Sequence, residues 1–439
     1  MTRFTIHSLI VGILLTAGCG RVTPVDEIDV ASSGIKLKEL AARADSTANW
    51  PVWRGPNGNG IAPDQTLPTT WSETDGILWR TDVPGRGHGS PIVVGDQILL
   101  ATALSKEQKQ LVLAYDRNTG DERWRYVVHE NGFPSSREVH QKGSNANGTV
   151  ASDGQRAYIA FFNSGKVTAT AVDLEGNEVW RTELGAFNSK FGFAPSPILY
   201  KSFVIFAVDN RGGGYIAAVD SESGDIAWRI ARPAENSHST PAIANLNGKD
   251  QMLISGCHKV VSYDPATGDE NWSTNCTTET TCGTIVAGND KLFASGGWPD
   301  KQTICLTGTG DKVWDNQTKV YEPSMLLDGE NLFAVSDDGI AWCRAADSGD
   351  MRWKKRLGGT FSSSPMLCNG NLYASNLSGE TFVFKASADG YEQVAVNRLG
   401  SDCYASPAVS LGRIFVRIGI GAGSDRREQL VCIGTHDEK

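Results

Sequence analysis

The chain has 439 residues and an ordinary globular composition, with 40% hydrophobic, 21% charged and 8% aromatic residues. This composition excludes an intrinsically disordered or a collagen-like protein. The net charge of −9 leaves no basic surface for nucleic acid, and after residue 19 no apolar run approaches the length of a membrane span.

Residues 1–18 predict a secretory signal peptide. Arg3 precedes an apolar stretch that runs from about Leu9 to Leu15, and small residues follow it. Such a stretch is too short for a membrane-spanning helix and has no stop-transfer charges behind it. We therefore expect an exported protein.

The end of this segment also suggests a lipid anchor. Residues 15–19 read LTAGC and resemble the lipobox of bacterial lipoproteins, whose cysteine is acylated and becomes the mature N-terminus. This resemblance makes Cys19 the lipid-attachment residue, and the alternative is simple cleavage beside an incidental cysteine. Gly20 is not the aspartate that resembles an inner-membrane retention signal, which favours the outer membrane, with the protein facing the periplasm or the cell surface.

Two short segments lie between this cysteine and the body of the chain. Residues 19–49 are the lipid-attachment cysteine and a polar linker, in which Ile35, Leu37 and Leu40 predict a helical turn or two. Residues 50–76 are a lead-in that opens with WPVWRGPNG.

From residue 77 onward the chain repeats. An Ala-x-Asp-x-x-Thr-Gly-x-x-x-Trp pattern recurs with its tryptophans about 40–55 residues apart, which is the spacing of propeller blades. A seventh copy, residues 384–394, has lost its tryptophan, whereas one tryptophan precedes the first copy. The repeat tryptophans are Trp79, Trp124, Trp180, Trp228, Trp272, Trp314 and Trp353.

A second marker precedes the repeats and sets the number of blades. A small residue followed by proline opens a β-rich run, and degenerate versions of this pair occur in three places. Apolar residues, a tight turn and more apolar residues follow, which is a strand–turn–strand pattern. The markers lie at residues 90–91, 148–149, 196–197, 240–241, 283–284, 323–324, 364–365 and 406–407.

These markers predict an all-β protein, an eight-bladed β-propeller of four-stranded antiparallel blades over residues 77–434, with a tail at 435–439. The strand near residues 77–83 has no marker and the last marker has no tryptophan, so the N- and C-terminal strands should close the ring within one blade. We expect the tryptophans to fill the wedges between blades and to donate their N–H groups to backbone carbonyls. Their role is then structural.

The repeat resembles the tryptophan-docking repeat of quinoproteins, the pyrroloquinoline-quinone (PQQ)-like propeller family, over residues 77–434. Residues 50–58 of the lead-in and residues 84–88 (PGRGH) are similar to a bacterial subfamily described as PQQ-binding-like or BamB-like. The resemblance specifies the fold better than the activity, because the same blades serve enzymes and scaffolds.

A PQQ-dependent dehydrogenase is one implication of this resemblance. Such enzymes imply an aspartate base, a Ca²⁺ held by glutamate, asparagine and aspartate oxygens, and usually a disulfide between adjacent cysteines. The chain has no adjacent cysteine pair, no EF-hand-like loop and no common hydrolase, metalloprotease or dinucleotide motif. We therefore assign no catalytic residue, no metal and no cofactor and favour a binding protein. A PQQ- and Ca²⁺-dependent oxidoreductase with an atypical site is the alternative.

Loops that join one blade to the next should gather around a central funnel and carry the binding site. The longest, residues 129–147, contains a His-x-Lys-x-Ser-x-Ala stretch that resembles a motif of the subfamily. A polar, partly cationic funnel would bind an anionic ligand such as a carboxylate, or a peptide segment. The alternatives are solvated loop residues, a zinc site at three loop histidines, or strand addition by a partner at a blade edge. The candidate funnel residues are Arg86, His88, His140, Lys142, Ser144, Lys190, His238, Phe361 and Tyr404.

Eight cysteines lie beyond residue 19. Cys276 and Cys282 are candidates for a local disulfide, because an exported protein folds in an oxidising compartment. Cys305, Cys343 and Cys432 take a repeat position that alanine holds in other blades, so we expect them to be small buried residues.

Together these features predict an exported, lipid-anchored propeller that acts as a binding scaffold in the cell envelope. The resemblance to BamB-like lipoproteins implies a role in outer-membrane protein assembly. The expected partner is an envelope protein or peptide, or a small anionic ligand, with membrane contact through the N-terminal lipid anchor and no nucleic acid.

Overall fold

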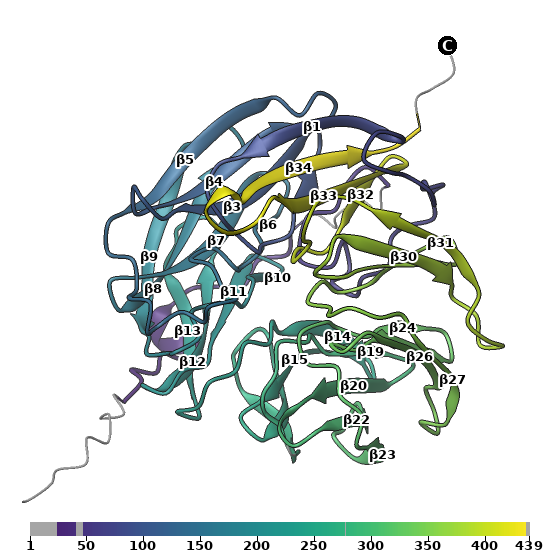
Figure 1. The fold of residues 1–439 in the computed structure, drawn as a ribbon. Coiled ribbons are helices and arrows are strands. Elements are labelled where there is room, and N and C mark those ends of the chain that lie inside the picture. The colour runs from purple at the N-terminus through teal and green to yellow at the C-terminus, as the bar shows by residue number, and fades with distance from the viewer. Residues whose placement is uncertain (1–23, 41–46, 277, 436–439) are drawn as a thin grey trace, which may run out of the picture.

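The computed structural model describes residues 24–40, 47–276 and 278–435, and these residues form a ring of eight antiparallel blades (Figure 1). The predicted fold class is confirmed: the chain is an all-β propeller with almost no helix. The predicted signal peptide and Cys19 lie outside the described residues, as does the chain after residue 435. Within the described part, no helix is both long and apolar enough to cross a membrane.

In the first four blades the strands follow one another in sequence order from the hub to the rim of the ring. Their bounds are β2 (Ile92–Val94), β3 (Gln97–Leu104), β4 (Lys109–Asp116) and β5 (Glu122–Glu130) in blade 1; β6 (Ala151–Ser152), β7 (Arg156–Asn163), β8 (Lys166–Asp173) and β9 (Glu178–Ala186) in blade 2; β10 (Ile198–Tyr200), β11 (Phe203–Val208), β12 (Gly214–Asp220) and β13 (Ile226–Arg232) in blade 3; β14 (Ala242–Leu246), β15 (Lys249–Gly256), β16 (Lys259–Tyr263) and β17 (Glu270–Asn275) in blade 4.

Blades 5–7 repeat this order, and blade 8 is built from both ends of the body. The bounds are β19 (Val286–Gly288), β20 (Lys291–Gly296), β22 (Gln302–Thr307) and β23 (Lys312–Asn316) in blade 5; β24 (Leu326–Asp328), β25 (Asn331–Val335), β26 (Ile340–Ala345) and β27 (Met351–Arg356) in blade 6; β28 (Met366–Cys368), β29 (Asn371–Ser375), β30 (Glu380–Lys385) and β31 (Gln393–Arg398) in blade 7; β32 (Ala408–Ser410), β33 (Arg413–Ile420), β34 (Arg427–Ile433) and β1 (Ile77–Val83) in blade 8.

Blade 8 closes the ring as the sequence predicts. Its order is β32, β33, β34 and β1, and β1 pairs antiparallel with β34 from Ile77 opposite Ile433 to Val83 opposite Glu428. The N-terminal strand of the body is therefore the outermost strand of the last blade. This pairing leaves no open seam between the two ends of the ring.

Few described elements lie outside the blades. A two-stranded sheet, β18 (Thr278–Thr280) with β21 (Trp298–Pro299), extends from blade 5, and a short 3₁₀ turn, η1 (Gly423–Asp425), joins β33 to β34. A single helical turn, α1 (Val30–Ser33), begins after Asp29, whose side chain accepts the N–H of Ser32.

The repeat tryptophans lie on the outer strands, and six of them pack across a wedge onto the turn glycine of the next blade. The seventh, Trp353, packs against Phe384 and Tyr391 instead. A Cβ built on Gly224 (φ 80°) would lie 2.7 Å from the Trp180 ring, so only glycine fits beneath the indole. The Trp180 indole N–H also donates to the carbonyl of Ser221 in blade 3, at 3.0 Å. Equivalent indole-to-carbonyl bonds join Trp79 to Arg117, Trp124 to Leu174, Trp272 to Gly308, Trp314 to Ala346 and Trp353 to Ser387.

At the hub, the sequence markers form a chain of hydrogen bonds around the ring. The backbone N–H of the Ser or Thr in one marker donates to the side-chain hydroxyl of the next marker. Seven such links of 2.8–3.0 Å are Ser90 to Thr149, Thr149 to Ser196, Ser196 to Thr240, Thr284 to Ser324, Ser324 to Ser364, Ser364 to Ser406 and Ser406 to Ser90. We call this set the hydroxyl ring.

The lead-in, residues 50–76, crosses the hub and contacts inner strands on both sides of it. Trp50 and Val93 of blade 1 exchange backbone hydrogen bonds of 2.8 and 2.9 Å, while Ala62 donates to Leu367 of blade 7 at 2.8 Å. Between them, the indole N–H of Trp53 donates to the hydroxyl of Thr284 at 3.0 Å. Thr284 is the hydroxyl-ring member that receives no marker N–H in the described structure, so the lead-in supplies the donor there.

The same segment buries a charge. Arg54 is 3% exposed and its guanidinium donates to the carbonyls of Met325 (2.5 Å) and Asn59 (2.9 Å). Burial lowers the pKa of Arg54 to about 9. The guanidinium joins the lead-in to the start of blade 6.

The described part of the predicted linker, residues 24–40, lies along blade 3 rather than apart from it. Ile28 forms an antiparallel bridge with Arg229 on the outer strand β13, and Val30, Ile35 and Leu37 pack against the cluster around Trp228. The predicted helical turn over residues 35–40 is wrong, because these residues have no regular secondary structure and the helical turn of this segment is α1.

Replacing Trp228 with alanine should lower the free energy of unfolding by about 3–5 kcal/mol, because a fully buried indole leaves a cavity. The Trp228 N–H has no partner among the described residues, so the loss is one of packing alone. Urea unfolding measures it. Trp298→Ala is the control, since that side chain is 60% exposed and should change stability by less than about 0.5 kcal/mol. Equal losses in the two variants would contradict the wedge role.

Candidate functional site

A cavity of about 890 Å³ lies at the hub, above the hydroxyl ring. Its wall includes the ring members Ser90, Thr149, Ser196 and Thr240, and Trp53 of the lead-in faces it. We call it the funnel cavity. Five of the predicted funnel residues line it: His88, His140, Lys142, His238 and Tyr404.

The other predicted funnel residues lie elsewhere. Arg86 and Ser144 line a smaller cavity of about 260 Å³ that shares Gly143 with the funnel cavity. Lys190 is exposed and does not line the funnel cavity. Phe361 is fully buried in the core between blades 6 and 7, where its phenyl ring packs. Its prediction as a funnel residue is therefore wrong.

His88 and Tyr404 form a flat aromatic pair on the funnel wall. Their rings are stacked, with centroids 4.1 Å apart and planes 2° from parallel. Burial lowers the pKa of His88 well below its ordinary value, and the nearby Arg86 and Arg417 act in the same direction. His88 is therefore neutral at pH 7, and its Nε2 has no hydrogen-bond partner among the described residues.

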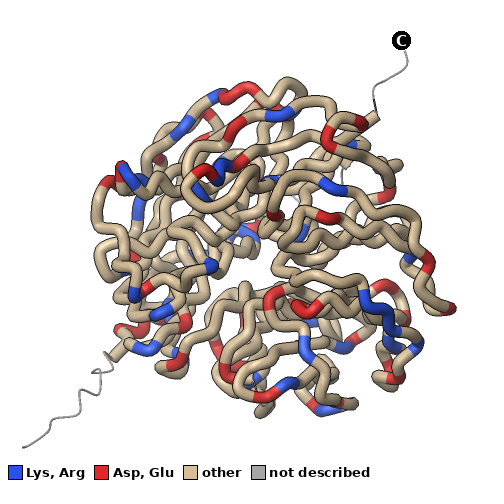
Figure 2. The backbone as a smooth tube through the Cα atoms, viewed as in Figure 1, with Lys and Arg blue, Asp and Glu red and all other residues tan. Residues whose placement is uncertain are grey.

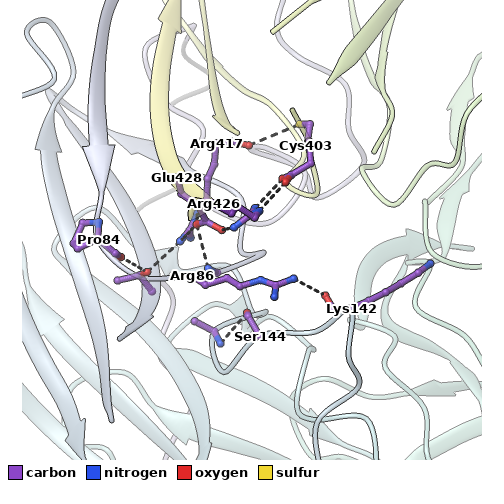
Figure 3. Close-up of polar contacts among 12 residues, drawn as sticks. Pro84, Arg86, Lys142, Ser144, Cys403, Arg417, Arg426 and Glu428 are labelled. Carbon is purple, nitrogen blue, oxygen red and sulfur yellow. Dashed lines mark hydrogen bonds and ion pairs between the residues drawn. The ribbon is translucent and has the colours of Figure 1, made fainter. Parts of the chain in front are cut away.

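A buried ion pair fixes the loop that carries His88 (Figure 3). Arg417 and Glu428 are 2% and 1% exposed, and Arg417 Nε donates to Glu428 Oε2 at 2.6 Å. The same carboxylate oxygen accepts the backbone N–H of Gly87 at 3.2 Å. A Cβ on Gly87 would lie 2.5 Å from Arg417 Nη1, so the loop approaches this closely only with glycine. Figure 3 also shows Arg86 reaching from this loop toward the backbone of Lys142.

His238 and His140 flank a third aromatic side chain, Phe191. The Phe191 ring meets His238 edge-on, with ring centroids 5.9 Å apart. It lies tilted against the His140 ring, with centroids 6.1 Å apart. Burial lowers the pKa of His238 to about 4. The described residues hold no group of three His, Cys, Asp or Glu side chains placed to bind a metal ion, so they do not assemble the zinc alternative.

An ion pair spans the funnel cavity from one side of the ring to the other. Lys142, in the long loop between blades 1 and 2, lies 3.3 Å from Glu322, in the loop between blades 5 and 6. These two positions are opposite one another in a ring of eight blades. Ser362 donates its hydroxyl to the second oxygen of Glu322. The Lys142 and Glu322 side chains are 47% and 26% exposed, so their attraction is worth no more than about 1 kcal/mol.

Two exposed aromatic side chains at this cavity were not predicted. Phe191 is 40% exposed and Trp298 is 60% exposed, and both line the funnel cavity. Trp298 lies on β21, in the small sheet outside the blades. The sequence did offer a signal for Trp298. It lies outside the tryptophan repeat, so the structural role of the repeat tryptophans does not account for it.

The described cysteines are free thiols, so the predicted disulfide between Cys276 and Cys282 is not formed. The strand β18 separates the two residues and extends the chain between them. The backbone N–H of Cys276 donates to His258 in blade 4, whereas that of Cys282 donates to Tyr321, in the loop after blade 5. Cys282 lines the funnel cavity, and burial raises the pKa of its thiol.

Charges of both signs are mixed over the face of the ring seen in Figure 2. Basic and acidic residues are scattered along the blades, and neither sign covers this face continuously. The fold and the repeat define a PQQ-like β-propeller.

The sequence matches the family described as outer membrane protein assembly factor BamB, over residues 64–189 and 108–355. The chain belongs to this family. None of the curated proteins matches the chain.

Solved structures share the fold at low sequence identity. BamB from Moraxella catarrhalis is 15% identical with a TM-score of 0.58, covering 83% of this chain and 98% of its own. A europium-containing methanol dehydrogenase is 11% identical (TM-score 0.64, 88% and 98% covered). A quinohemoprotein alcohol dehydrogenase from Comamonas testosteroni is 12% identical (TM-score 0.66, 93% and 85% covered). At these identities the likeness concerns the fold alone.

The stability of the protein should depend on His238 between pH 6.5 and 4. Its pKa falls from 6.5 to about 4 in the folded chain, so protonation favours the unfolded state. The contribution of His238 is complete above pH 6.5, and about 3 kcal/mol of it should be lost by pH 4. Urea unfolding of wild type and His238→Gln across this range measures the difference. Parallel pH profiles would contradict the burial of a neutral imidazole.

Proposed function

We propose that this protein is a non-catalytic binding scaffold that holds a segment of another envelope protein in its funnel cavity. The supporting observation is a cavity of about 890 Å³ with Phe191 and Trp298 exposed beside it. Exposed aromatic side chains next to a cavity are typical anchor points for a partner. The weak ion pair between Lys142 and Glu322 lies across this cavity.

The location of this scaffold follows from its N-terminus and its family. The signal-like residues 1–18 and the LTAGC sequence support export and acylation at Cys19. Membership of the BamB family supports a role in outer-membrane protein assembly. A small carboxylate is the other occupant that the basic loop residues suggest.

The double variant His140→Ala, Lys142→Ala should keep its thermal midpoint within about 2 °C of wild type, because both side chains are exposed. It should nevertheless lose most of its cross-linking to the partner when a photoreactive side chain replaces Lys190 in intact envelopes. Cys19→Ser, in the same experiment, should leave the membrane fraction. A large drop in the thermal midpoint of the double variant would make the long loop a structural support instead.

A PQQ-dependent oxidoreductase is the second candidate. The fold shared with the methanol and alcohol dehydrogenases favours it, and the flat ring of Trp53 faces the cavity. The described carboxylates give little support for calcium, however. The carboxylates that line the cavity are Glu279 and Glu322, and Glu322 is already bound by Lys142 and Ser362. A calcium ion needs six or more oxygen ligands.

Titration with PQQ and Ca²⁺ separates the two candidates. The chain from residue 20 onward should show no saturable quenching of tryptophan fluorescence and should retain no quinone after desalting. Tight, stoichiometric retention would reverse the order of the candidates and justify a screen of alcohol and sugar substrates.

A further inference from the structure

One buried polar side chain in the funnel wall has no partner. Asn236, in the loop between β13 and β14, is 1% exposed and lines the funnel cavity. Its backbone carbonyl accepts the hydroxyl of Thr280 at 2.8 Å. Neither Oδ1 nor Nδ2 of its side chain has a hydrogen-bond partner among the described residues. Leaving a buried amide unpaired costs free energy, so the fold gains nothing from this side chain.

Asn210, a second buried asparagine in the same half of the ring, has a carboxamide that is fully hydrogen-bonded within the protein. It is fully buried, and its Nδ2 donates to the carbonyls of Val208 (3.1 Å) and Gly213 (2.9 Å). Its Oδ1 accepts the N–H groups of Gly212 (2.9 Å) and Asn188 (3.2 Å). Asn236 differs because neither its donor nor its acceptor meets a protein group within the described chain, although the residue lines the funnel cavity.

An unpaired carboxamide has a defined complement. It offers one acceptor and two donors side by side. A residue of an extended peptide presents its own N–H and C=O in the same arrangement, as strands do when they pair. A peptide main chain therefore satisfies Asn236 on both sides.

The cations of the cavity point to the charge of that peptide. Lys142 is paired with Glu322 at 3.3 Å and Lys319 with Asp337 at 2.9 Å. Arg211 is exposed, lines the same cavity, and within the described chain its guanidinium forms no ion pair or hydrogen bond. A free guanidinium prefers a carboxylate, which it binds through two parallel hydrogen bonds.

The other residues of the cavity wall limit which ligands can bind. Phe191 and Trp298 offer apolar area for a side chain of the ligand. Glu279 and Glu322 line the same cavity and repel a polyanion such as a nucleotide. One carboxylate opposite Arg211 is tolerated, whereas a run of negative charge is not.

We propose that the funnel cavity recognises an extended peptide that carries one acidic and one aromatic or large apolar residue. Asn236 pairs with the peptide main chain, Arg211 binds the acidic side chain, and Phe191 and Trp298 pack against the apolar one. This inference rests on the proposed function and names the class of segment that the scaffold holds.

The test uses fluorescein-labelled pentapeptides with one phenylalanine and one glutamate in both orders. Counterparts replace the glutamate with glutamine, or the phenylalanine with alanine, or carry N-methylated backbone amides. Fluorescence anisotropy with the purified protein should show saturable binding of at least one parent peptide. Each counterpart should bind at least tenfold more weakly. Absence of binding across the panel, or displacement of the peptide by free glutamate at equal concentration, overturns the proposal.

Two matched variants assign the binding to the named side chains. Asn236→Leu should weaken the parent peptide at least tenfold while leaving the thermal midpoint unchanged or higher, because no intramolecular bond is lost. Asn210→Leu, the control, should lower the midpoint clearly. Arg211→Gln should weaken the glutamate peptide but not its glutamine counterpart. A drop in the midpoint of Asn236→Leu that equals that of the control makes Asn236 structural and overturns the assignment.

Cross-linking in envelopes distinguishes this inference from the proposed function. If Asn236→Leu still captures the partner through the photoreactive residue at Lys190, the scaffold stands and peptide recognition by Asn236 fails. If the wild type binds the pentapeptides through Asn236 but captures no envelope protein, the peptide site stands and the proposed function fails.

Discussion

The hydrogen bond between a backbone N–H and the hydroxyl of the next blade is the contact on which the rest of this propeller depends. It recurs around the hub, where neighbouring blades are closest, and it fixes their spacing to within a hydrogen-bond length. The tryptophan on the outer strand, which blade 7 lacks, then only has to fill the wider end of the wedge. The inner contact also determines the funnel, because loops anchored at regular positions on a rigid ring hold their side chains toward one space.

The architecture could be predicted because it is encoded many times over. A turn glycine and a tryptophan recur with a similar spacing. A copy that has lost part of the pattern, such as residues 384–394, can therefore be recognised from its distance to the neighbouring copies. The Ser/Thr-Pro markers could be found in the same way, although their hydrogen bonds could not. A hydroxyl that accepts from another blade depends on spacing in three dimensions, and Ser406 and Ser90 are far apart in the chain. The docked residues 24–40 carry no repeat and gave no comparable signal.

The site was predictable only in part, for a related reason. His88, His140 and His238, which the sequence places in interblade loops, line one cavity. Position in a loop failed as a signal for Phe361, since a loop residue turns toward solvent or core according to local backbone geometry. Trp53 and Trp298 lie on segments that no blade pattern describes. An unpaired amide such as that of Asn236 cannot be recognised in a sequence at all, because it is defined by partners that are missing.

The pairing of β1 with β34 has a consequence for the order of folding. Ile77 meets Ile433, so a strand made early stays unpaired until almost the whole body exists. Contacts of such long range form slowly, because the entropy of closing the loop is lost before any contact compensates for it. Until then blades 1 and 7 have no neighbour on one side, and their buried faces are open. A chain that ends before its last strand is therefore an open arc, with an exposed apolar blade face at each end. Premature truncation should produce aggregation rather than a smaller ring.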